Sequence, residues 1–391
     1  MRQITSWAVF IPSLVLVVIL LASVVFPALI LGSLETRFPI DINVFELGSF
    51  AAPLLITNGI IFFVILLYHT KKLPKIIENP LQRIFEFETS KGITVIVLIG
   101  IIGTYCIISV PELTQQDPWE DYTRTVKPEL EKWSPDDPLS LKTLVYLLGN
   151  VSMQIFGTYR VIPLIASVAM LILTYLITLE ISKKRFAGLV SVVIVIQSSN
   201  FMTYDTTITY PNFWGAFYLL SLYLIFKKWY GSAISFVGAF LTKILALGLL
   251  PTSIAFAALA NIPRRRKIAV IASFAVLPII GIPFTYYIDN SIIDIQEFDS
   301  LDFLSSLGIL STQFRYDLVI VLFLLPVTFG IFIRAKNRLE NANSVQVLIF
   351  TMLLVAILIP ALSTYTNSPY RFVPFSAFFA IGVGTILSKL R

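Results

Sequence analysis

The chain has 391 residues, of which 57% are hydrophobic and 13% charged, with a formal net charge of +6. Its mean hydropathy of +0.84 excludes an ordinary soluble domain. The single cysteine, Cys106, excludes an internal disulfide framework, and the single histidine, His69, excludes histidine-based metal or triad chemistry.

Apolar segments that approach the length needed to cross a bilayer recur along the whole chain. The first is too long for a signal-peptide core and lacks a small-residue cleavage site, so it is predicted to be a retained span. We expect an all-α, polytopic bundle of about 12 spans, at 8–31, 53–69, 92–110, 161–181, 186–199, 212–227, 231–246, 248–262, 268–287, 317–333, 345–362 and 372–388. The pair 231–246 and 248–262 leaves an alternative open, because Pro251 could kink one re-entrant element instead of separating two spans.

Lysine and arginine are distributed unequally between the two sides of this predicted bundle. With Met1 in the cytoplasm, 20 of the 29 Lys and Arg lie in inside segments and 8 in outside segments, while Lys243 lies within a span. This bias predicts that both termini are cytoplasmic. The protein would then be a multi-pass protein of the cell membrane, or of the endoplasmic reticulum membrane in a eukaryote. The net positive charge follows from orientation, and no basic motif predicts nucleic-acid binding.

A polar segment, 111–139, interrupts the apolar chain after the third predicted span. It holds eight of the 23 acidic residues, beside tryptophan and tyrosine, on the predicted outer side. Carboxylates at the end of a span are well placed to take protons or hold cations. The segment 140–157 follows, and its mixed three- and four-residue apolar spacing predicts an amphipathic helix at the outer interface.

Several short motifs then follow one another in an informative order. Asp117-Pro118-Trp119-Glu120-Asp121-Tyr122 is similar to the acidic-aromatic motif of oligosaccharyltransferase catalytic subunits, and Tyr204-Asp205 resembles their second acidic motif. Leu241-Thr242-Lys243 and Tyr370-Arg371-Phe372-Val373-Pro374 resemble elements of protein mannosyltransferases and lipid A aminoarabinose transferases. Over about 92–391 the chain therefore resembles the GT-C superfamily of membrane glycosyltransferases, with an outer loop at 111–159. The segment 1–91 adds two N-terminal spans and a cytoplasmic loop.

The resemblance implies an inverting glycosyltransferase. Such an enzyme moves a sugar, for example mannose from dolichyl phosphate, from a polyprenyl-phosphate carrier to a protein, lipid or glycan acceptor at the outer or luminal face. The resemblance places the catalytic base at Asp117, with Asp121 and then Glu120 as the next choices. The implied substrate-binding residues are Asp205, Arg160, Arg371, Lys243, Tyr122 and Trp119. No cofactor is implied with certainty, although Asp117 and Asp205 could share Mg²⁺ or Mn²⁺.

The chain also departs from the family pattern. The acceptor-recognition motif of oligosaccharyltransferases is missing, so en bloc transfer to asparagine is not expected. Asp205 is followed by Thr206 and Thr207 where the second motif has a further acidic residue. Two other functions stay open: a transporter or flippase for a lipid-linked or anionic solute, and a non-catalytic subunit of a membrane assembly.

Each candidate also has a structural alternative. Acidic residues of the loop could be simply solvated, and Trp119 and Tyr122 could be interfacial aromatics. Arg160 and Arg371 could be anchors whose head groups reach the interface. If the candidates do form a site, one outer cavity with a lateral opening to lipid should be walled by 111–157, 200–211 and 363–372.

Overall fold

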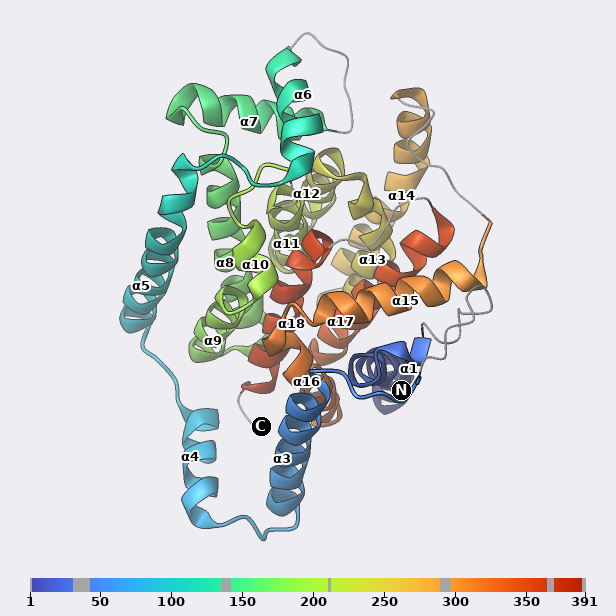
Figure 1. Cartoon of the computed structure of the whole chain (residues 1–391). Helices are drawn as coiled ribbons and strands as arrows, with labels where there is room; N and C mark the ends of the chain where they lie inside the picture. The colour runs from blue at the N-terminus through green and yellow to red at the C-terminus, as the bar shows by residue number, and fades with distance from the viewer. Residues whose placement is uncertain are drawn as a thin grey trace.

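The computed structural model describes residues 2–30, 43–134, 142–209, 212–288, 297–363 and 369–388, and all regular structure in these ranges is helical (Figure 1). The expectation of an all-α protein is thus confirmed. Parts of several predicted segments, including 135–141 of the acidic loop and 364–368 of the last outer loop, lie outside the described residues.

Six of the described helices are long and apolar enough to cross a membrane. They are α1 (Arg2–Val25), α3 (Ala51–His69), α5 (Lys91–Ser109), α8 (Val161–Ser182), α16 (Leu318–Lys336) and α17 (Ala342–Leu362). α3 and α5 bury little of their surface, whereas about half of α1, α8 and α17 is buried. α1 packs against α15 (Ser300–Phe314), α16 and α17, so the predicted N-terminal extension is packed into the same helical body.

Six further apolar helices of the described residues, five of them shorter, pack beside the long ones. They are α9 (Arg185–Ile196), α11 (Asn212–Lys227), α12 (Trp229–Thr242), α13 (Leu250–Leu259), α14 (Arg264–Ile288) and α18 (Val373–Ile386). α18 lies among α8, α9, α16 and α17, and nearly all of its side chains are buried. Its small residues allow this close approach: Gly384 lies against α8 and α9, where a Cβ would overlap Ser191 and Thr178.

The acidic segment folds into a layer at one end of the helical body. After α5 come the 3-10 helix η2 (Val110–Thr114), the π-helical turn η3 (Tyr122–Val126) and α6 (Lys127–Lys132). α7 (Thr143–Phe156) follows and ends at Gly157, which has a left-handed φ of 70°. The helix predicted at 140–157 is therefore confirmed, apart from its first residues, which lie outside the described ranges.

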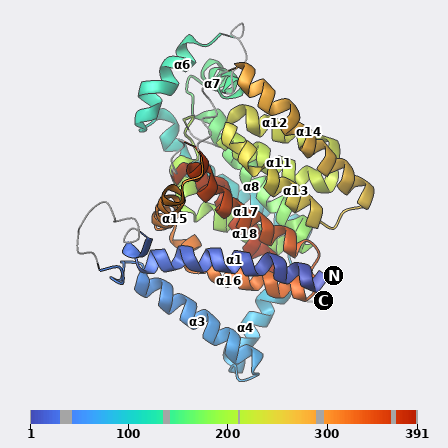
Figure 2. The ribbon, with the colours of Figure 1, turned by 90° about the vertical axis from the view of Figure 1, so that its right-hand side faces the viewer.

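The two chain ends lie on the opposite side from this layer. Figure 2 shows the beginning of α1 and the end of α18 on the side away from α6 and α7, and Figure 1 agrees. The α13–α14 and α16–α17 connections also lie with the beginning of α1, because they line one cavity with it. These two lysine- and arginine-rich connections therefore lie opposite the acidic layer.

Several described helices were not predicted, and α15 and α4 are the two longest of them. α15 lies in a segment that we expected to be an outer loop, and it packs against α17 and α1. α4 (Lys75–Glu86) is an amphipathic helix, and none of its residues is buried. Its C-terminal carbonyls at Ile84 and Phe85 accept hydrogen bonds from the buried Lys184 Nζ at 3.1 and 2.8 Å.

The uncertain region 231–262 forms α12, a 3-10 helix and α13, and the break falls at Lys243, before the boundary expected at residue 247 and before Pro251. α12 ends before Lys243, whose backbone is extended (φ −157°, ψ 117°). The 3-10 helix η4 (Ile244–Leu249) follows, and Pro251 lies in the first turn of α13, where a proline is tolerated. The extended residue thus places a lysine at the junction of two apolar helices.

Candidate functional site

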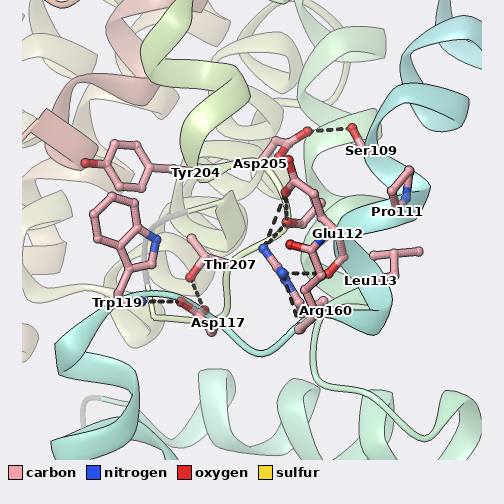
Figure 3. Close-up of polar contacts among 12 residues, drawn as sticks. Ser109, Pro111, Glu112, Leu113, Asp117, Trp119, Arg160, Tyr204, Asp205 and Thr207 are labelled. Carbon is pink, nitrogen blue, oxygen red and sulfur yellow. Dashed lines mark hydrogen bonds and ion pairs between the residues drawn. The ribbon is translucent and has the colours of Figure 1, made fainter.

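Asp205 follows α10 (Ser199–Tyr204) and is completely buried. Ser109 Oγ, at the end of α5, donates a hydrogen bond of 2.8 Å to its carboxylate (Figure 3). The backbone carbonyl of Asp205 accepts hydrogen bonds from Ser167 Oγ and Asn212 Nδ2, both at 2.7 Å. Burial raises the pKa of Asp205 to about 6. Asp205 therefore joins α5, α8 and α11 below the acidic layer.

Asp117 lies in the same region and is only 4% exposed. One carboxylate oxygen accepts from the backbone N–H of Trp119 at 3.2 Å, and the other accepts from Thr207 and, at 3.3 Å, from Thr209 (Figure 3). Thr207 is two residues from Asp205, and one extended residue spans at most about 3.6 Å, so their Cα atoms are within about 7 Å. The structure therefore brings both predicted carboxylates to one region.

Arg160 is also buried, and its guanidinium is bound by the protein itself. Nη1 donates to the carbonyls of Glu112 at 2.5 Å and Gln115 at 3.3 Å. Nη2 donates to Thr206 Oγ1 at 2.7 Å and lies 3.4 Å from a carboxylate oxygen of Glu112. Arg160 thus fastens the start of the acidic segment to the 205–209 turn. These four contacts engage both terminal nitrogens, whereas Nε has no hydrogen-bond partner among the described residues.

The aromatic candidates have different roles. Tyr122 is buried in a small core with side chains of α6 and α7 and with Ile208 and Phe213, and burial raises its pKa to about 12. Trp119 stacks on Tyr204, with ring centroids 4.8 Å apart, and Tyr204 meets Tyr370 edge to face at 6.1 Å. Tyr370 belongs to η5 (Pro369–Phe372), so this row of rings connects the acidic segment with η5.

A cavity of about 250 Å³ lies beside this row. Its lining comes from the acidic segment, α7, the 208–209 turn, η5, the start of α11 and the end of α12. The charged side chains that line the cavity are Asp121, Lys142 and Lys243, and Tyr370 lines it as well. All three segments predicted to wall an outer cavity contribute, and the described residues do not test its lateral opening.

The remaining candidates divide between the cavity and its surroundings. Asp121 is exposed and lines the cavity, whereas Glu120 forms a surface ion pair of 2.6 Å with Arg124, in which both side chains are well exposed. Lys243 Nζ lies 5.2 Å from the centroid of the Tyr370 ring. Arg371 lines a narrow apolar cavity between η4 and α17, which shares the side chain of Trp214 with the first.

Comparison with known proteins identifies no relative. No protein-family model matches the chain, and no curated protein or solved structure is significantly similar to it. The residues themselves therefore carry the functional argument.

The donor set around Asp117 and Asp205 does not fit a divalent cation. Among the described residues, no group of three or more His, Cys, Asp or Glu side chains is placed to hold a metal ion. Both oxygens of Asp117 accept hydrogen bonds, and one oxygen of Asp205 accepts from Ser109. These carboxylates are placed as acceptors of N–H and O–H groups, and we derive no step from a shared Mg²⁺ or Mn²⁺.

Sequence reasoning missed several residues of the site. Thr206 and Thr207 were noted only as replacements for an acidic residue, yet their hydroxyls bind Arg160 and Asp117 respectively. Lys142 was counted only as an outside charge, although it lines the cavity and pairs with Glu129 at 3.2 Å. Hydroxyl residues directly after a buried carboxylate are the signal that could have indicated this network.

Proposed function

We propose that the protein is an inverting membrane glycosyltransferase that uses a polyprenyl-phosphate sugar donor at the face formed by the acidic layer. The observation that carries this proposal is the cavity in which one exposed carboxylate, Asp121, lies with two lysines, Lys142 and Lys243. Transfer of a glycosyl group from a lipid phosphate needs one base and a positive charge near the leaving phosphate, and this cavity offers both.

Asp121 is the proposed base. The acceptor hydroxyl gives its proton to the Asp121 carboxylate as its oxygen forms a bond to the anomeric carbon, and the bond between that carbon and the phosphate oxygen breaks. A base must reach the reacting hydroxyl. Asp121 lines the cavity with an exposed side chain, whereas the Asp117 carboxylate is buried and accepts three hydrogen bonds. The first choice made from sequence, Asp117, becomes a residue that positions the loop.

Lys243 is the proposed partner of the donor phosphate. A lysine between two apolar helices is costly unless it pairs or reaches an interface. Among the described residues Lys243 forms no ion pair, and its Nζ lies over the Tyr370 ring. The neighbouring apolar cavity, lined by Trp214, Leu249 and Ile359 with Arg371 at its edge, has a volume of only about 30 Å³ and would have to widen to receive an isoprene unit.

This proposal extends to the membrane topology. Six described helices meet the length of a span, and α9, α11, α12, α13, α14 and α18 would complete the twelve expected spans. The charge distribution supports an orientation with the acidic layer outside and both termini in the cytoplasm.

The experiment measures sugar transfer from a panel of polyprenyl-phosphate donors by the purified protein in liposomes. We expect Asp121→Asn to lower turnover by about 10²-fold or more, because an amide cannot accept the proton. Glu120→Gln is the matched control, since Glu120 is adjacent in sequence but lies on the solvent side in an ion pair with Arg124. It should retain full activity.

The same assay separates the alternatives. Full activity of Asp121→Asn, together with loss in a folded Asp117→Asn protein, would return the role of base to Asp117. Retention of transfer in both variants would reject an enzymatic use of the loop. Failure of the unaltered protein to transfer any sugar would favour the non-catalytic subunit, a function that the structural contacts of Asp117 and of the two terminal nitrogens of Arg160 also suit.

A further inference from the structure

A second and larger cavity lies at the opposite end of the molecule. Its volume is about 680 Å³, within the range of ligand-binding pockets. It is lined by the start of α1, the end of α13, the start of α14 and the turn between α16 and α17. It belongs to neither the acidic layer nor the proposed transfer site.

Positive charge predominates in the lining. Lys267, Lys336 and Arg338 face the cavity against one carboxylate, Glu340, and three asparagines contribute further polar atoms, Asn261, Asn341 and Asn343. Clusters of lysine and arginine in pockets between helices near the cytoplasmic surface suit phosphate-bearing head groups. The composition therefore indicates an anionic ligand.

The walls of this cavity are held in place by contacts of their own. Lys336 Nζ lies 5.3 Å from the Trp7 ring centroid, which joins the end of α16 to α1. Asn341 Oδ1 accepts a 2.5 Å hydrogen bond from the backbone N–H of Asn261, which joins the α13–α14 connection to α17. Arg338 adopts a left-handed φ of 63°, and its N–H bonds back to the carbonyl of Ala335 at 3.1 Å. The cavity is thus preformed.

An apolar wall completes the lining. Ile4, Leu259, Leu339, Ala258 and Ala335 line the same cavity, and Ile4 is 74% exposed. A free phosphate ion would gain nothing from aliphatic side chains, whereas a phospholipid presents a phosphate joined to glycerol and acyl chains. We propose that this cavity binds the head group of an anionic phospholipid from the adjacent leaflet, with Lys336 and Arg338 on the phosphate and the aliphatic wall on the first acyl carbons.

The test uses the full chain in a neutral detergent and measures the affinity of phosphatidylglycerol by titration. Phosphatidylcholine serves as the zwitterionic comparison, and glycerol phosphate supplies the same phosphoester without acyl chains. Each basic residue near an anionic head group contributes roughly a fivefold gain in affinity. We expect Lys336→Gln/Arg338→Gln to weaken phosphatidylglycerol binding by about 10- to 30-fold.

The matched control is Arg264→Gln/Arg265→Gln. It removes the same charge from exposed residues in the first turn of α14 that do not line the cavity, and we expect a change of less than about threefold. Because Lys336 also contacts aromatic rings, Arg338→Gln alone, at an exposed side chain, should still lose about fivefold. Equal losses in both double variants, or none in either, would overturn the site. Equal affinity for glycerol phosphate would overturn its assignment to a lipid.

Discussion

Two acidic residues that look alike in sequence occupy different environments in the folded chain. Asp117 ties the acidic segment to the 205–209 turn, while Asp121, four residues later, faces the cavity. The motif could be located from the sequence, because acidic and aromatic residues cluster after an apolar segment. The different roles of Asp117 and Asp121 could not be predicted, because they depend on how the 205–209 turn aligns with the acidic segment. In the fold, Thr206 is hydrogen-bonded to Arg160 and Thr207 to Asp117.

The buried carboxyl of Asp205 leads to a prediction of pH-dependent stability. Its pKa is raised to about 6 in the folded protein, whereas an aspartate in the unfolded chain has a pKa of about 3.9. A raised pKa means that the folded state holds the proton more tightly. The resulting stabilisation is complete below about pH 4 and is lost as the pH rises through about 6. Asp205→Asn cannot ionise, so its stability relative to the unaltered protein should rise between these pH values, by up to about 3 kcal/mol.

Thermal unfolding of both proteins at pH 4, 5, 6 and 7 measures this difference. Glu120→Gln, at an exposed carboxylate, is the control and should follow the unaltered protein at every pH. A stability difference between Asp205→Asn and the unaltered protein that stays constant across the range would show that Asp205 does not titrate there.

At the scale of helices, strong apolar patterns were predictable and weaker ones were not. The long spans were found because their hydropathy is a local property of the sequence. α15 was missed because Asp302 and several serines dilute its apolar character, and its burial arises only from contact with α17 and α1. The break at Lys243 was placed at residue 247 instead, and Pro251, considered as a possible kink, is harmless in a first helical turn.

The packing of α18 gives a prediction at this scale. A Cβ at Gly384 would overlap Ser191 Oγ and Thr178 Cγ2 and lie 3.0 Å from the carbonyl of Ala187. Gly384→Ala should therefore push α18 away from α8 and α9 and destabilise the fold by about 1–3 kcal/mol. Gly100→Ala is the control, because nothing lies within 4 Å of a Cβ there. Thermal unfolding in detergent compares them, and equal midpoints would show that the contact can relax.

At the scale of the whole molecule, the charge distribution divides the fold into two ends. The acidic layer lies at one end, and the chain ends with the basic cavity lie at the other (Figure 2). The separation of the two ends was predictable, because it follows from the positions of lysine and arginine between the apolar segments of the sequence. The basic cavity was not predictable, because its lining comes from the beginning of α1 and two separate connections that only the fold brings together.

The proposed orientation can be tested with single cysteines in a Cys106→Ala background. Thr123 in the acidic layer and Asn337 in the α16–α17 turn are both exposed. With the acidic layer outside, Thr123→Cys should react with a membrane-impermeant maleimide in intact cells, and Asn337→Cys should react only after permeabilisation. The reverse labelling pattern would invert the topology and place the proposed transfer site on the cytoplasmic side.

The contacts that hold the acidic segment join residues far apart in the chain. Ser109 and Asp205 are separated by 96 residues, Asp117 and Thr207 by 90, and Tyr370 closes the aromatic row last. During synthesis the segment therefore cannot form these contacts until the later helices have been made. A ribosome-bound chain that ends after α13 would carry Asp121 and Lys243 but lack Tyr370 and Arg371. Competence for any chemistry at this site would thus be acquired late in biogenesis, when η5 reaches the acidic layer.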